Sequence, residues 1–322
     1  MFRILLTCLI CLHVLHSTAQ KIRKEDYLFI DKLVQDYGPM RGSSMQYIVD
    51  SITRDCKTEL QATRAFYRFM FLYLSFDLRR QQHPGKYPDN ASSALMERKA
   101  GSAGFAAMFK AMCDLKKIEC RIVRGVLRYR VKDIGSFDPD AIHFWNIVSI
   151  NNTQYLIDPS LACGYFEEKK FIREYSDAWW LTNRKLFACT HFPDDKKMQL
   201  LELPLSKTEY TQAPLAGAAA IVAGLVPTQT VKGTIRGSAD SITKMKFTIA
   251  GHLDILNVQI AFDKESPIPL RFDLDQFGIY LFVPNGPAGK HTAKIFIKDK
   301  PAFVFRTDIR KGLQKKESGS KR

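Results

Sequence analysis

Residues 143–160 have the sequence HFWNIVSINNTQYLIDPS, which is the most informative stretch for the fold class. Two runs rich in β-branched and aromatic residues flank the pair Asn151-Asn152. Asparagine tolerates the positive φ angles of a type I′ turn, so the stretch predicts a tight β-hairpin. A two-residue loop sets Ile150 opposite Thr153, and it thereby fixes the register along both strands.

The predicted register brings two polar side chains to one face of the hairpin. Trp145 lies opposite Asp158, so His143 and Asp158 are diagonal neighbours, about 7 to 8 Å apart at the backbone. An imidazole and a carboxylate reach one another across that distance, and the hairpin predicts an aspartate that orients a histidine. The same residues are also consistent with purely structural roles. His143 then makes its hydrogen bonds within the sheet, and Asp158 forms the turn before Pro159.

Helices precede the hairpin. Residues 22–90 predict helices, because apolar residues recur at spacings of three and four, and they end in a loop at 81–90 that is rich in Pro, Gly and Asn. A further helix begins after Gly101. Ser102 stands at its start, where the positive end of the helix dipole favours an anion, so Ser102 is the candidate nucleophile beside the predicted histidine.

A basic strand is predicted between that helix and the hairpin. Residues 121–132 alternate between apolar and charged side chains, which is typical of a half-buried strand. Such a row of cations is most often a solvated face, although four like charges on one edge favour an acidic partner. The candidate anion-binding or partner-binding residues are Arg124, Arg128, Arg130 and Lys132.

The order of elements predicts two domains. Helices followed by an antiparallel sheet make an α+β domain at 20–206. Residues 207–230 are rich in Ala, Gly, Pro and Thr and predict a link. Short apolar runs between turn residues predict a β-sandwich at 231–308 that resembles an immunoglobulin-like module. Residues 309–322 predict a disordered basic tail.

The first 19 residues have the layout of a secretory signal. In residues 1–19 one cation, Arg3, precedes an apolar stretch and then small residues, with cleavage expected before Gln20. We therefore expect a secreted protein, extracellular or periplasmic; a retained anchor would need a longer apolar segment. The longest later apolar run, 215–226, is shorter than the roughly 20 residues of a membrane span, so no stable span is expected.

The net charge and the cysteine content indicate which partners, disulfides and metal sites are expected. The formal net charge of +15 favours a protein or an acidic surface polymer. No nucleic acid is expected, because no helix-turn-helix, zinc or RNP-type pattern accompanies the charge. Five of the seven cysteines follow residue 19, without CxxC spacing, so no disulfide framework is predicted. One or two bridges are compatible with an oxidising compartment, with at least one thiol left free. No cofactor is predicted. Cys163, Cys189 and His191 lack a fourth ligand at finger-like spacing, so no metal is predicted. The oligomeric state is not predicted.

Four separated motifs occur in an order that a known family shares. They are RKAGSAGFAAMFKAMCDLKKIECRIVRGV at 98–126, HFWN at 143–146, YLIDPS at 155–160 and THFPDDKKMQLL at 190–201. Over about residues 45–205 the chain resembles the transglutaminase-like superfamily, most closely its kyphoscoliosis peptidase branch. The resemblance implies a papain-like or transglutaminase-like core, in which helices pack on an antiparallel sheet, followed by an Ig-like domain.

The resemblance also implies roles for single residues. The histidine and aspartate of the family fall on His143 and Asp158, which agrees with the hairpin register. The nucleophile of the family is a cysteine, and Ser102 stands in its place, while Met198 stands where the last motif usually has tryptophan. Trp145 and Asn146 are expected in the cleft, where Trp145 forms a wall unless it belongs to the core.

The serine determines the expected function. A histidine and a helix N-terminus can hold a thiol as thiolate, whereas a hydroxyl stays protonated at neutral pH. The prediction is therefore a pseudoenzyme that works as a binding or scaffold protein. The alternative is an acyl-transfer enzyme or peptidase that uses Ser102, His143 and Asp158 as a triad.

Overall fold

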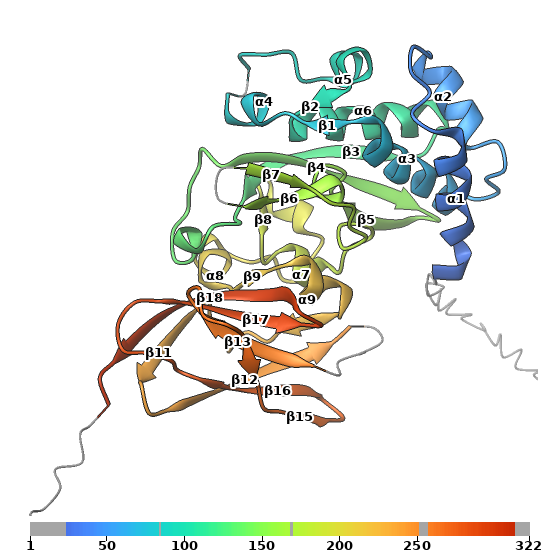
Figure 1. Ribbon diagram of the computed structural model, residues 1–322. Coiled ribbons are helices and arrows are strands. Elements are labelled where there is room, and N and C mark those ends of the chain that lie inside the picture. Colours follow the sequence, from blue (N-terminus) through green and yellow to red (C-terminus); the bar gives the residue numbers. More distant parts are fainter. Residues whose placement is uncertain (1–23, 84, 168–169, 251–256, 313–322) are drawn as a thin grey trace, which may run out of the picture.

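The computed structural model describes residues 24–83, 85–167, 170–250 and 257–312. The predicted signal at 1–19 lies outside these residues, as does most of the predicted tail. Figure 1 shows three levels: helices at one end, a sheet beneath them, and a strand-rich part at the other end. Among the described residues, no helix combines the length and the apolar character needed to cross a membrane.

The first level consists of helices whose apolar faces share one core. Side chains such as Phe66, Phe69 and Phe109 are fully buried there, because the apolar spacing of three and four puts them on inward faces. The elements are η1 (Lys24–Asp26), α1 (Leu28–Tyr37), α2 (Met45–Ile52), α3 (Glu59–Tyr73), α4 (Leu78–Gln82), α5 (Ala91–Glu97) and α6 (Ser102–Leu115), with the short strands β1 (Ser75–Phe76) and β2 (Lys99–Ala100).

The second level is an antiparallel sheet of order β5-β4-β3-β8. Its strands are β3 (Cys120–Leu127), β4 (Ile142–Ile150), β5 (Thr153–Ile157) and β8 (His191–Pro193). The predicted hairpin is confirmed: Ile150 pairs with Thr153, and φ is 49° at Asn151 and 61° at Asn152. Helix α6 packs on β3 and β4, so the start of this helix lies over the hairpin.

The predicted basic strand is shorter than its alternation suggests. Strand β3 ends at Leu127, and the chain then enters the 3-10 helix η2 (Val131–Asp133). The carboxylate of Asp133 accepts the backbone N–H groups of Tyr129 and Arg130, at 3.3 Å and 3.0 Å. These two amides are therefore bound to a side chain instead of to a neighbouring strand, and the alternation beyond Leu127 does not describe a sheet face.

Short elements complete the first domain. They are η3 (Leu161–Cys163), β6 (Gly164–Glu167), β7 (Lys170–Arg173), α7 (Arg184–Phe187) and η4 (Lys196–Gln199). Strands β6 and β7 form a separate two-stranded sheet.

The predicted link at 207–230 is instead built into the fold. It contains α8 (Lys207–Gln212), β9 (Leu215–Ala216), α9 (Ala218–Val222) and β10 (Leu225–Pro227). Strand β10 pairs with β12 and strand β9 with β18, so the stretch extends both sheets of the second domain. The reason is burial: Leu215, Ala220 and Leu225 join the core of that domain.

The second domain is a β-sandwich. Its sheets have the orders β10-β12-β16-β15 and β11-β18-β17-β13-β14. The two sheets meet through apolar side chains such as Phe247 and Phe303, whose ring centroids lie 5.0 Å apart. The strands are β11 (Thr234–Ser238), β12 (Ile242–Ile249), β13 (Val258–Phe262), β14 (Ile268–Pro269), β15 (Phe272–Asp275), β16 (Gly278–Pro284), β17 (Thr292–Ile297) and β18 (Lys300–Arg310).

The predicted fold class, an α+β core followed by a β-sandwich, is confirmed. The start of the predicted tail differs, because Ile309 is buried in the sandwich core and β18 runs to Arg310.

Candidate active site

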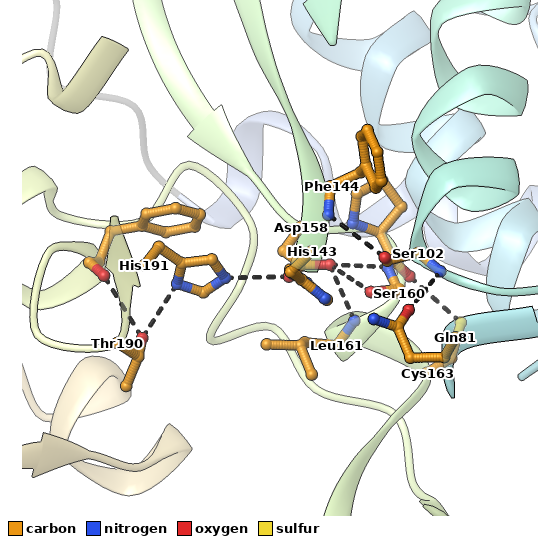
Figure 2. Close-up of polar contacts among 12 residues, drawn as sticks. Gln81, Ser102, His143, Phe144, Asp158, Ser160, Leu161, Cys163, Thr190 and His191 are labelled. Carbon is orange, nitrogen blue, oxygen red and sulfur yellow. Dashed lines mark hydrogen bonds and ion pairs between the residues drawn. The ribbon is translucent and has the colours of Figure 1, made fainter. Parts of the chain in front are cut away.

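Ser102 is the first residue of α6 and is only 1% exposed. Its Oγ accepts a hydrogen bond from the backbone N–H of Phe144, at 3.2 Å. Because Phe144 follows His143 on β4, this bond holds the hydroxyl against the strand that carries the histidine. Figure 2 draws this bond between Phe144 and Ser102 as a dashed line. The structure thus brings the predicted nucleophile position to the strand that carries the predicted histidine.

His143 and Asp158 meet as the hairpin register predicts. The Nε2 of His143 lies 2.7 Å from Oδ2 of Asp158, and both side chains are fully buried. The other oxygen of Asp158, Oδ1, accepts from the backbone N–H of Ser160, the hydroxyl of Ser160 and the backbone N–H of Leu161, at 2.9 Å, 2.7 Å and 3.0 Å. These bonds fix the carboxylate, and the carboxylate in turn fixes the plane of the imidazole.

A second histidine, His191, completes the cluster. It begins β8, and its Nε2 lies 3.1 Å from the same Oδ2 of Asp158. Its ring stacks on Phe187, with centroids 3.8 Å apart, and Thr190 Oγ1 lies 2.9 Å from its Nδ1. From the sequence, His191 is considered only as a metal ligand, and its contact with Asp158 is not predicted, although the residue lies inside the motif at 190–201.

The cluster has a defined charge state. Burial alone would raise the pKa of Asp158, but the charges of His143 and His191 and the hydrogen bonds from them hold it far below its usual range. Burial lowers the pKa of His191 to about 4, against the bond and charge of Asp158, which raise it. At neutral pH Asp158 is therefore ionised and His191 is neutral, so the Nε2–H of His191 donates to the carboxylate.

One nitrogen in the cluster is left unused. Nδ1 of His143 is buried and has no hydrogen-bond partner in the part of the chain that the structure describes. With Nε2 committed to Asp158, Nδ1 is the ring atom that is free to exchange a proton with a group beside it. Among the described residues, the hydroxyl of Ser102 is not a partner of this nitrogen; its Oγ bonds to the N–H of Phe144 instead.

The backbone amides at the start of α6 are already occupied. The N–H of Ser102 donates to Oε1 of Gln81 at 3.0 Å, and the N–H of Gly101 donates to Oδ1 of Asp89 at 2.9 Å. Gln81 is itself held by a bond from its Nε2 to the carbonyl oxygen of Ile142, at 2.6 Å. The sequence analysis misses Gln81 and Asp89, because it treats 81–90 as a plain loop.

The expected cleft residues are in the core. Trp145 is 1% exposed and lies against the rings of Phe187 and His191. Asn146 is fully buried, and its Nδ2 donates to the carbonyl oxygen of Ala106 at 3.0 Å, which ties β4 to α6. Trp145 is therefore a core residue, which is one of its two predicted roles. The predicted role of Asn146 in an open cleft is wrong, because α6 packs directly on it.

The predicted basic row does not exist as one surface. Arg128 is 3% exposed and donates to the carbonyl oxygens of Thr211 and Cys189, at 2.8 Å and 2.6 Å. Two others are paired with carboxylates: Arg124 with Asp194, and Arg130 with Asp133 and Asp138. Lys132 belongs to η2 and not to the strand. The early end of β3 explains why the four residues Arg124, Arg128, Arg130 and Lys132 do not share a face.

The cluster is suited to hydrogen bonding and poorly suited to a metal ion. Donor atoms of His143, Asp158 and His191 lie within 4.8 Å of one another. However, both oxygens of Asp158 already accept hydrogen bonds from protein groups, five in all, so a cation would have to displace them. Cys163 and Cys189 point elsewhere and donate to the carbonyl oxygens of Pro159 and Lys185.

This geometry, a buried histidine and aspartate beside the start of a helix, agrees with the comparisons with known proteins. Residues 46–159 match the family model described as the transglutaminase-like superfamily, and the match includes Ser102, His143 and Asp158. The chain therefore carries a transglutaminase-like domain, which confirms the resemblance.

The curated relatives define the branch. The chain is 27% identical over 171 residues to a kyphoscoliosis peptidase from Homo sapiens, and 26% identical over 171 residues to the one from Mus musculus. Each match covers 52% of this chain and 26% of the relative, so the chain aligns with about a quarter of these relatives. A Lim and transglutaminase domain protein from Caenorhabditis elegans is 21% identical over 189 residues, covering 53% of this chain and 25% of that protein.

Two solved structures are also similar. A crystal structure of a TGase, 14% identical, matches 50% of this chain and 39% of that chain with a TM-score of 0.29. A putative cysteine protease from Cytophaga hutchinsonii, 14% identical, matches 43% of this chain and 48% of that chain with a TM-score of 0.30.

Proposed function

We propose that the chain is a secreted, catalytically inactive transglutaminase-like protein that works by binding a protein or an acidic surface polymer. The observation that carries this proposal is Ser102, a hydroxyl at the position where the family resemblance places a cysteine. A helix N-terminus and a histidine can stabilise a thiolate near neutral pH, but they cannot ionise a serine. Serine catalysis would need a preformed oxyanion site as well as a base.

The surroundings of Ser102 support inactivity. An oxyanion formed there would draw on the amides of Ser102 and Gly101, and these already donate to Gln81 and Asp89. Finally, a side chain that is 1% exposed offers no direct path to a peptide substrate.

Turnover measurements test the proposal. Purified wild type, Ser102→Ala and Ser102→Cys are compared on peptide substrates and on glutamine donors with an amine acceptor. We expect no turnover above background for wild type and Ser102→Ala. Wild-type turnover that disappears in Ser102→Ala would overturn the proposal. Activity in Ser102→Cys alone would support it, since it would show that sulfur is the missing group.

The second candidate is an acyl-transfer enzyme or peptidase that uses Ser102, His143 and Asp158. One observation favours it: the carboxylate of Asp158 holds Nε2 of His143 at 2.7 Å, as the orienting acid of a triad holds its base. That arrangement is the one a general base requires. The candidate predicts turnover that is lost in Ser102→Ala and in His143→Ala, with both variants folded.

Secretion rests on the layout of residues 1–19. When the full chain is expressed in cells with a secretory pathway, we expect the protein in the medium to begin at Gln20 by N-terminal sequencing. Retention of residues 1–19 in the recovered protein would contradict this part of the proposal.

A further inference from the structure

A groove separates the two domains on the side where β11 and β18 end. Its walls are the η2 segment of the first domain and the sheet β11-β18-β17 of the second, and in Figure 1 the loop with η2 reaches down toward this sheet. The groove consists of two adjacent cavities of about 200 Å³ and 350 Å³. Both cavities are lined by Lys290, Arg306 and Thr307, so they form one continuous site.

The strand register explains why polar side chains line this groove. On the parallel pair β11-β18, Thr234 lies opposite Arg306 and Arg236 lies opposite Asp308. Because side chains alternate along a strand, these four share the outer face of the sheet. Residues at the alternate positions of these strands, such as Ile235 and Ile309, point into the sandwich core and are buried.

Four cations line the groove, and none of them is paired with a carboxylate in the described part of the chain. Lys132 lines the larger cavity, Arg236 lines the smaller one, and Lys290 and Arg306 line both. Within residues 24–83, 85–167, 170–250 and 257–312, none of the four forms a salt bridge to a carboxylate. Arg306 is oriented by a hydrogen bond from its Nη1 to the carbonyl oxygen of Ile134, at 3.0 Å, which crosses between the domains.

The acidic groups nearby do not neutralise these cations. Asp263 is engaged by His291 Nδ1 at 2.7 Å and by the backbone N–H of Thr292 at 2.9 Å. Nε2 of His291 lies 3.2 Å from the carbonyl oxygen of Ala288, so both ring nitrogens face acceptors. The hydrogen bond to Asp263 raises the pKa of His291, which favours its charged form. Asp308 is then the carboxylate left to offset four cations in the groove.

We propose that this groove binds an oligoanion that carries two sulfate or phosphate groups, one in each cavity. Guanidinium and ammonium groups bind such oxyanions through charge-assisted hydrogen bonds. Pockets for drug-sized molecules usually measure about 300 to 1,000 Å³. The smaller cavity lies below this range and the larger one near its lower end, so each suits a single charged group. The inference deepens the proposed binding role and rests on it, because it gives the acidic partner a chemistry and a place.

Isothermal titration calorimetry at fixed ionic strength tests this inference on the chain that begins at Gln20. The probes are a heparin-derived sulfated tetrasaccharide, its desulfated counterpart and inorganic tripolyphosphate. The groove variant is Lys132→Ala with Lys290→Ala, since both side chains are exposed and their loss should leave the fold intact. The matched control is Lys32→Ala with Lys99→Ala, two exposed lysines that line neither cavity and carry the same total charge.

We expect the tetrasaccharide to bind, its desulfated counterpart not to bind, and the groove variant to raise the Kd at least about tenfold while the control stays within about twofold. Binding of tripolyphosphate alone, with the same dependence on the groove lysines, supports the inference with phosphate as the source of the anion. Binding of neither anion, or equal weakening in both double variants, overturns it.

Turnover of the same samples separates this result from the proposal on Ser102. The groove shares no residue with the buried cluster around Asp158. A groove that binds no anion in a protein without turnover would leave the inactive-domain proposal intact. Turnover in a protein that still binds anions would overturn inactivity and leave the groove in place.

Discussion

His143 and His191 direct their Nε2 atoms at the same carboxylate oxygen of Asp158, at 2.7 Å and 3.1 Å. The three side chains come from different strands or strand ends, and all are fully buried. Asp158 is therefore the point at which β4, the end of β5 and β8 are joined. This role in stability exists whether or not the site performs chemistry.

Asp158→Asn should destabilise the fold strongly. The carboxamide removes the buried charge and sets an N–H against one of the donors around it, and breaking a buried charged network costs about 3 to 5 kcal/mol. The measurement is the free energy of unfolding in urea. Asp194→Asn is the control, because that carboxylate pairs with Arg124 at the surface and its loss should cost at most about 1 kcal/mol. Equal losses in the two variants would refute the joining role.

The free energy of unfolding should fall between pH 6.5 and pH 4 because of His191. Its pKa is about 4 in the folded protein against an ordinary 6.5, so the unfolded chain binds the extra proton across this window. Stability is complete above pH 6.5 and decreases as the pH falls, by up to about 3 kcal/mol at pH 4. In His191→Gln, the dependence of the free energy of unfolding on pH should lose the contribution of about one proton. Urea unfolding at several pH values measures this dependence. An unchanged slope would show that His191 is not the titrating group.

Gln81→Ala should cost about 1 to 2 kcal/mol of stability. The substitution leaves the amide of Ser102 and the carbonyl group of Ile142 without their side-chain partner. Gln82→Ala is the matched control, because Gln82 is exposed, and it should change stability by no more than about 0.5 kcal/mol. Thermal unfolding of the two variants decides between these outcomes. Indistinguishable variants would mean that Gln81 does not hold the helix start.

Arg128→Ala should behave as a core mutation and not as a loss of surface charge. Three carbonyl oxygens lose a donor, and the contact of the guanidinium with the ring of Tyr210 at 4.2 Å is lost. We expect a loss of about 3 kcal/mol. Retention on heparin should be unchanged when the variant is assayed below its unfolding temperature. A stable variant with reduced retention on heparin would indicate that Arg128 belongs to a basic surface, as the sequence predicts.

The thiols should be free and slow to react. The five cysteines that follow residue 19 form no disulfide among the described residues. Burial raises the pKa of Cys56 to about 11 and that of Cys189 to about 12, so little thiolate exists at pH 8. Ellman's reagent should detect five thiols in guanidinium chloride and react slowly with the native protein. Fewer than five thiols after unfolding would contradict the free state.

The sequence predicts the parts of the site that depend on local geometry. A two-residue loop leaves the hairpin only one register, so His143 and Asp158 are placed by arithmetic along the chain. Gly101 marks the start of α6 and so places Ser102. Each of these inferences needs only the chemistry of a turn or of a helix end.

The parts of the site that the sequence does not predict depend on contacts between distant segments. His191 reaches Asp158 because β8 pairs with β3, and no local pattern in three residues predicts that pairing. Gln81 and Asp89 contact α6 from a short helix and from a loop. The composition of this stretch indicates only that the preceding helices end there. Arg128 alternates with its neighbours in sequence, but the strand ends before it, where the carboxylate of Asp133 accepts the amides of the next two residues.

The central claim is that Ser102 does not act as a nucleophile, and a fluorophosphonate probe tests it most directly. Such probes react covalently with an activated serine, and intact-protein mass spectrometry followed by peptide mapping reads out the labelled residue. We expect folded wild-type protein to keep its unmodified mass after incubation with excess probe at neutral pH. We expect the same result for His143→Ala. Stoichiometric labelling at Ser102 that is lost in His143→Ala would contradict it.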